Sequence, residues 1–69
     1  MTAKEALRRD NINDSISMLK ITKKLVETNF QIIKEKLIEV DAIDDEAKLM
    51  SNSVREINRL IKNLEAKTW

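Results

Sequence analysis

The sequence predicts an all-helical fold, and three observations support that prediction. It contains no glycine and no proline, the residues that most often punctuate the turns of β-structures. Leu, Ile, Lys, Glu, Ala and Asn dominate the chain, and most of them are good or fair helix formers. Apolar residues also recur at alternating spacings of three and four, which is the period of one helical face. We therefore expect residues 1–69 to form a single helical module.

The first expected element is a short helix over residues 2–10. Thr2 and Glu5 have the spacing of a capping box, in which the Thr hydroxyl accepts a hydrogen bond from the third helical N–H. Residues 10–15 then read Asp-Asn-Ile-Asn-Asp-Ser, and most of these side chains compete with helical backbone hydrogen bonds. This composition predicts that the first helix is short and that a kink or restart follows it.

The second expected element is a helix over residues 12–40, which carries a heptad pattern. Its apolar residues alternate four and three positions apart, as in helices that wrap around one another. These residues form an apolar line along one face of the helix, here called the seam, and Lys23 is the one polar residue in it. Lys23 either extends its ammonium group to water or fixes the register of the helix pair. The apolar seam residues of this helix are Ile12, Ile16, Leu19, Val26, Phe30, Ile33, Leu37 and Val40.

The third expected element is a helix over residues 44–67, with a seam of its own. Its seam residues are Ala47, Met50, Val54, Ile57, Ile61 and Leu64, and Leu49 and Leu60 flank this seam on opposite sides. The two seams are out of register by one residue, and the mismatch falls within residues 40–46.

Two structures accommodate this mismatch. In the first, the chain turns and forms a helical hairpin. In the alternative, one long coiled-coil helix continues through a three-residue stammer. Acidic residues open each long segment and basic residues follow, which suits two separate helix dipoles and favours the hairpin. The absence of a glycine at the end of the first long helix argues against the hairpin.

A second apolar stripe accompanies the seam of the longer helix. Met18, Leu25 and Ile32 each precede a seam residue by one position, and Ile21 lies further round. A face this wide exceeds what one neighbouring helix covers. The residues that we predict to bind a partner are Met18, Ile21, Leu25, Ile32, Leu49 and Leu60.

Composition argues against most other functions. The chain has no histidine, no cysteine and no glycine, so it lacks the usual bases, thiol nucleophiles and phosphate-binding loops of enzymes. We expect no enzymatic activity, no cofactor and no metal. Asp41, Asp44, Asp45 and Glu46 are better explained as helix-capping residues than as cation ligands.

Charge and hydropathy limit the expected partners and location. The chain has 13 basic and 12 acidic residues, a balance that argues against nucleic acid as a partner. No apolar run is long enough to span a membrane, and the first residues do not resemble a secretory signal. Together with the absence of cysteine, this leads us to expect a cytoplasmic protein without a membrane span.

The expected function is protein–protein interaction through helix packing. The leading hypothesis is a subunit that assembles with itself or with other helical proteins into a bundle, as a homo-oligomer or a hetero-complex. The alternative is a small chaperone or regulatory adaptor that clamps one client helix. In either case, the exposed apolar stripe is the surface that makes contact.

Overall fold

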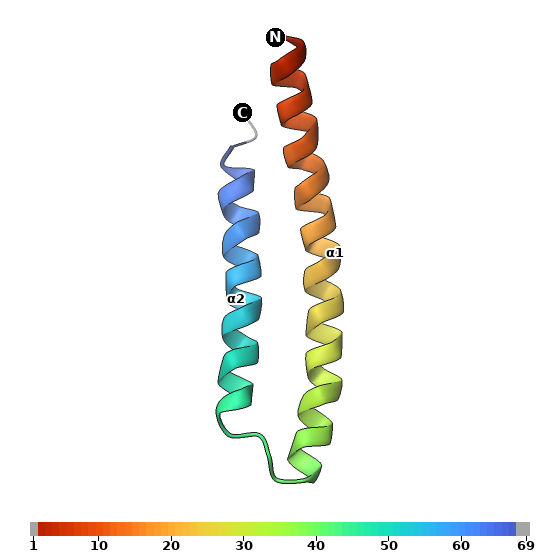
Figure 1. Ribbon diagram of the computed structural model, residues 1–69, viewed down its shortest axis with the longest axis vertical. Coiled ribbons are helices and arrows are strands. Elements are labelled where there is room, and N and C mark those ends of the chain that lie inside the picture. Colours follow the sequence, from red (N-terminus) through yellow and green to blue (C-terminus); the bar gives the residue numbers. More distant parts are fainter. Residues whose placement is uncertain (1, 68–69) are drawn as a thin grey trace.

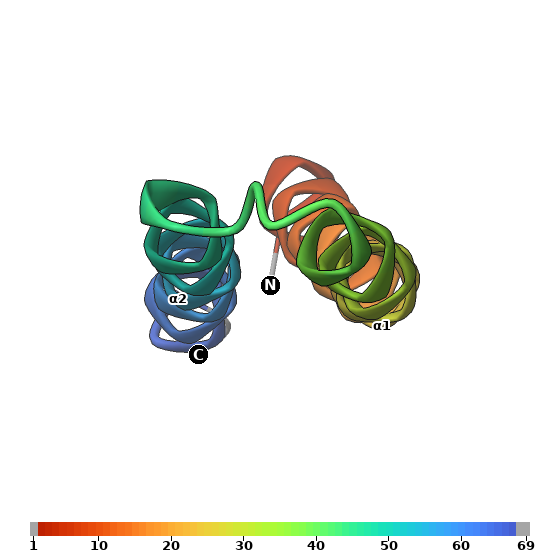
Figure 2. The ribbon, with the colours of Figure 1, turned by 90° about the horizontal axis from the view of Figure 1, so that it is seen from below.

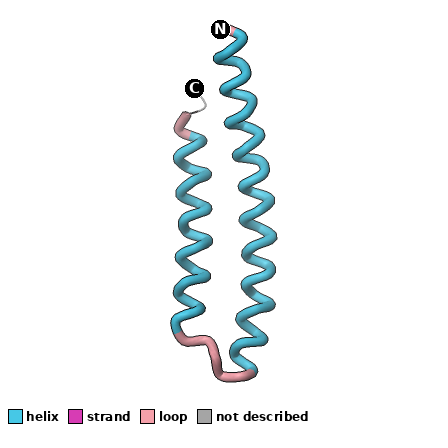
Figure 3. Tube along the Cα trace, viewed as in Figure 1, coloured by secondary structure: helices cyan, strands magenta, loops and turns pink. Residues whose placement is uncertain are grey.

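The computed structural model describes residues 2–67, and within them the chain forms two antiparallel helices. Helix α1 spans Ala3–Glu39 and helix α2 spans Asp45–Glu65. They lie side by side along most of α2 and are joined at one end of the molecule (Figure 1). The predicted all-helical hairpin is confirmed, and the continuous helix is excluded. Figure 3 shows that the loop segments are confined to the connection and the ends of the helices.

Helix α1 is continuous, so the separate helix over residues 2–10 and the break at residues 10–15 were wrong. The expected cap is present: the backbone N–H of Glu5 donates to Thr2 Oγ1 at 3.1 Å. Ser15 does not interrupt the helix, because its Oγ donates to the carbonyl of Asn11 at 2.8 Å within it. The low helix propensity of Asp, Asn and Ser costs at most about 0.7 kcal/mol per residue. Burial of Ile16 helps to offset this cost.

The connection explains how a chain without glycine makes the turn. Asp41 adopts a left-handed backbone with φ 55°, the conformation that glycine usually supplies after a helix. The N–H of Ala42 donates to the carbonyl of Leu37 at 2.9 Å, and that of Asp41 donates to Ile38 at 3.1 Å. This is the paired hydrogen bonding of a Schellman motif. Aspartate tolerates the left-handed region better than most residues, so Asp41 ends α1 where no glycine is available.

The start of α2 is less well capped than the end of α1. Asp44 occupies the N-cap position but makes no side-chain capping hydrogen bond. Asp45 and Glu46 lie in the first turn of α2, where their negative charges suit the helix dipole. These residues therefore support the turn mainly through charge rather than through a side-chain cap.

The contact between the helices is made by the two seams. Ile16 and Ile61 are the only buried apolar residues within the described chain, at 8% and 6% exposed. The half-buried seam residues are Ile12, Leu19, Val26, Phe30 and Leu37 of α1, with Ala47, Met50, Val54, Ile57 and Leu64 of α2. The hairpin is therefore held together by one narrow apolar strip.

Two residues expected in the seam lie elsewhere. Val40 is 69% exposed because α1 ends at Glu39 and Val40 is its C-cap. Ile33 is 40% exposed, whereas Lys34 beside it is half-buried. A straight helix has 3.6 residues per turn and drifts away from a strict heptad. Towards the turn, this drift moves Ile33 to one side of the contact line and Lys34 to the other.

The molecule is a single layer of two helices. Seen along the helices, α1 and α2 lie next to each other, and no other described element covers either side of the layer (Figure 2). The dimensions are 56 × 16 × 11 Å. Because α1 has 37 residues and α2 has 21, the N-terminal end of α1 projects beyond α2 (Figure 1).

Candidate interaction surfaces

Four exposed apolar residues form a row on α1, here called the outer row: Met18, Ile21, Leu25 and Ile32. These side chains are 68%, 62%, 60% and 47% exposed. At about 100° per residue, the outer row is centred about 150° around α1 from the seam. The stripe is therefore not an extension of the seam, as the sequence pattern suggested, but a separate face of the helix. Helix α1 consequently carries apolar residues on two nearly opposite faces.

The outer row has the spacing of a second heptad. Its members are three, four and seven residues apart, and Thr28 falls at the position missing between Leu25 and Ile32. The Thr28 hydroxyl donates to the carbonyl of Lys24 at 2.9 Å. With its hydroxyl already bonded inside the helix, Thr28 requires no polar partner from a neighbouring helix. The outer row is therefore suited to contact another helix over its whole length.

Leu49 and Leu60 form a smaller apolar surface on α2. They are 64% and 46% exposed. The expectation that they flank the seam on opposite sides was wrong, because eleven residues complete about three helical turns. Both lie on the same side of α2, and the 40% exposed Ile33 of α1 is turned to that side of the hairpin.

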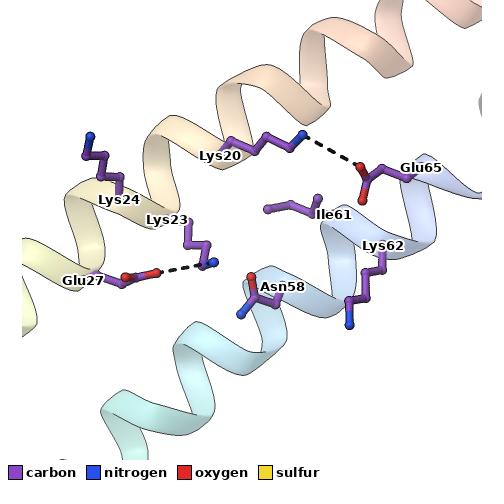
Figure 4. A pocket seen from close by; sticks show the side chains of 8 residues that line it. All are labelled: Lys20, Lys23, Lys24, Glu27, Asn58, Ile61, Lys62 and Glu65. Carbon is purple, nitrogen blue, oxygen red and sulfur yellow. Dashed lines mark ion pairs between the residues drawn. The ribbon is translucent and has the colours of Figure 1, made fainter.

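The other side of the hairpin carries a groove, here called the lysine groove. It consists of two adjoining hollows of about 440 Å³ each, which share Lys23, Glu27 and Asn58. Apolar residues from both helices line the bottom of the two hollows. Figure 4 shows the first hollow, with Ile61 and Lys23 between the helices and with Lys24 and Lys62 extending away from them on either side. The floor residues are Phe30, Met50, Val54 and Ile61. None of the six residues predicted to bind a partner lines either hollow.

Two ion pairs form along the lysine groove. Lys20 Nζ lies 3.8 Å from Glu65 Oε2 and joins the two helices, and Lys23 Nζ lies 3.6 Å from Glu27 Oε1 within α1 (Figure 4). The side chain of Lys23 is 33% exposed, so its stem packs at the seam while its ammonium group reaches the groove. Of the two roles considered for Lys23, this geometry supports the first.

The described residues offer little else for chemistry. Within residues 2–67, no group of three or more carboxylates is arranged to hold a metal ion. In the same part of the chain, no helix is both long enough and apolar enough to cross a membrane. The distinctive features of the surface are therefore the outer row, the Leu49 and Leu60 side, and the lysine groove.

Comparisons with known proteins find no family model, no curated protein and no solved structure that matches this chain. The function must therefore be argued from its surfaces. The six residues predicted from the sequence to bind a partner are all exposed, but the exposed Leu7 and Ile38 were not among them, and the lysine groove was missed as a single feature. The sequence does not show which sides of the two helices face each other. Only when these sides are known does Lys62 of α2 fall beside the lysines of α1.

Proposed function

We propose that this chain is a non-enzymatic interaction module that assembles with itself or with other helical subunits through the outer row of α1. The observation that carries this proposal is the second apolar face of α1, which the hairpin leaves uncovered. In a helical bundle, a helix with two apolar faces occupies a position between two neighbours. Helix α2 is one of these neighbours, and we assign the other to a partner chain.

The exposed surface area supports this proposal. The accessible surface is 5728 Å², whereas a compact monomer of 8.0 kDa exposes about 4,450 Å². The excess is about 1,300 Å², and a standard protein interface buries about 800 Å² on each partner. The hairpin therefore has more than enough surplus surface for one interface of ordinary size.

The energy available at the outer row also supports a partner. Full burial of a large aliphatic side chain contributes about 1.5–3 kcal/mol, so four would contribute about 6–12 kcal/mol. Because these side chains are still 47–68% exposed, roughly three-fifths of that sum, about 4–7 kcal/mol, remains available to a partner. This contribution matches the whole stability of many small domains.

The proposal is tested by measuring the mass of the chain in solution, by sedimentation at several micromolar concentrations. We expect the parental chain to self-associate or to bind a helical partner. The double variant Leu25→Lys with Ile32→Glu should keep its helical circular dichroism but lose self-association or partner binding. Asn52→Lys with Asn63→Glu introduces the same two charges on exposed positions of α2 and should leave assembly unchanged.

One result would contradict the subunit proposal. If the parental chain is a well-folded, monodisperse monomer at micromolar concentration without any partner, its outer row does not require permanent cover. That result would instead favour the alternative function, a chaperone or adaptor that is stable alone and clamps a client helix only transiently.

A further inference from the structure

We infer that the lysine groove is a second docking surface, and that its occupant is an acidic amphipathic helix of another protein. This surface lies on the side of the hairpin away from Leu49 and Leu60 and does not include the outer row. The inference is therefore independent of the proposed assembly through α1. It rests on the charges at the edges of the groove, the apolar floor and the length of the groove.

The charges along the groove are unbalanced. Among the described residues that line the groove, five are lysines (Lys20, Lys23, Lys24, Lys34 and Lys62) and two are glutamates (Glu27 and Glu65), although the chain as a whole has a net charge of only +1. Each glutamate already pairs with one of these lysines. Within the described chain, Lys24, Lys34 and Lys62 form no ion pair. Three positive charges are therefore available to carboxylates of a partner.

The positions of these free lysines define the edges of a binding site. Lys24 and Lys34 belong to α1 and Lys62 to α2, so uncompensated charge stands on both sides of the floor. In Figure 4, Lys24 and Lys62 extend from opposite helices, with Ile61 between these helices. A helix with a central apolar stripe and carboxylates on both sides of it matches this pattern.

The size of the groove also fits a helix. On α1 it extends from Lys20 to Lys34, which corresponds to about 21 Å at 1.5 Å per residue. A helix of about four turns covers that distance. Packed over the groove, such a helix would complete a three-helix arrangement around the apolar residues of the floor.

The same charges argue against two other occupants. A second copy that inserted its outer row would bring residues 18–32 of the copy toward the lysines of the groove, and this segment contains three lysines but only one carboxylate, Glu27, which already pairs with Lys23. Nucleic acid is less suitable because, among the described residues, no arginine lines the groove, and the one aromatic residue that does, Phe30, is half-buried in the floor. Stacking on exposed aromatic side chains is a main source of affinity for single strands.

The experiment measures binding of dye-labelled peptides to the full chain by fluorescence anisotropy. The probe is an 18-residue peptide with Leu at helical spacing along one face and Glu on both flanks. One control peptide has Lys in place of each Glu, and another keeps Glu but has Gln in place of each Leu. We expect the probe to bind at least about tenfold more tightly than either control and to weaken as salt is added.

Charge-reversal variants locate the site. Lys24→Glu with Lys62→Glu changes two exposed groove residues that make no ion pair, so the helices should be retained. We expect this variant to lose at least about tenfold in affinity. Lys48→Glu with Arg55→Glu makes the same charge change on exposed residues of α2 that do not line the groove, and should change the affinity by less than about threefold. Amide chemical shifts around Val54 and Asn58 should move when the probe binds.

Three results would overturn the inference: equal losses in the two charge variants, equal binding of the Leu-free peptide, or tighter binding of a single-stranded oligonucleotide than of the probe. The Leu25→Lys with Ile32→Glu variant separates this test from that of the proposed function. It should bind the acidic probe as the parental chain does, whether or not the parental chain self-associates.

Discussion

The two helices of this hairpin contain similar residues but distribute them differently. On α2, the large apolar residues lie on the seam or, in the case of Leu49 and Leu60, on one side of it. On α1, most of them occupy the seam or the outer row about 150° away. Helix α2 is thus suited to the edge of a helical layer, and α1 is suited to its interior. The comparison shows that exposed apolar residues are informative through their arrangement rather than their number.

The largest expected difference is between a carboxylate placed on the seam and a carboxylate placed on the outer row. Ile61→Asp puts a carboxylate at the most buried position of α2 and should cost more than about 3 kcal/mol, enough to unfold most of this small module. Ile21→Asp on the outer row should change the free energy of unfolding of the isolated hairpin by less than about 0.5 kcal/mol. Urea denaturation followed by circular dichroism at low concentration measures both. Similar losses in the two variants would mean that the outer row is covered within a single chain.

An intermediate effect is expected from the one polar residue in the seam of α1. Lys23→Leu replaces a side chain that is 33% exposed and should raise the free energy of unfolding by about 1 kcal/mol. Loss of the exposed ion pair with Glu27 offsets only about 0.3–0.5 kcal/mol of the gain. The control Lys24→Leu lies outside the seam and should show no comparable increase in the urea midpoint. An unchanged midpoint for Lys23→Leu would place residue 23 outside the contact with α2.

The smallest expected effect concerns the end of α1. Asp41→Gly removes the steric cost of a left-handed residue, while the more flexible glycine stabilises the unfolded chain. The net result should be a gain of about 0.5 kcal/mol in the free energy of unfolding. Asp41→Val should instead destabilise the hairpin, because a β-branched residue disfavours positive φ. If the two variants have the same melting temperature, Asp41 does not adopt the left-handed conformation in solution.

The hairpin could be predicted from the sequence because it depends on the spacing of apolar residues, a regular pattern visible over short stretches of the chain. The seams of α1 and α2 each keep a heptad spacing, and their one-residue mismatch correctly located the turn. The predicted break at residues 10–15 was wrong because side-chain competition with the backbone is weak compared with packing. Ser15 simply bonds within the helix. The left-handed Asp41 was not foreseen, since the absence of glycine was taken only as an argument against a turn.

The candidate surfaces were less accessible to sequence reasoning. Exposure of the outer row was predicted, but its separation from the seam required each residue to be placed around the helix axis. The lysine groove required more, because Lys24 and Lys62 lie far apart in the sequence and are related only by the pairing of the two helices. Because basic and acidic residues nearly balance over the whole chain, the net charge did not reveal the local excess of lysines on one side of the hairpin.

The antiparallel order of the two helices has a consequence during protein synthesis. Helix α1 is complete before any of α2 exists, so its seam and its outer row are both uncovered at first. At about 5–20 residues per second, the 21 residues of α2 take about 1–4 s to produce. Helix–coil relaxation takes about a microsecond or less. The nascent α1 therefore has ample time to form while both of its apolar faces are exposed, before α2 is available to cover the seam. Early binding by a partner or a chaperone would protect it from aggregation.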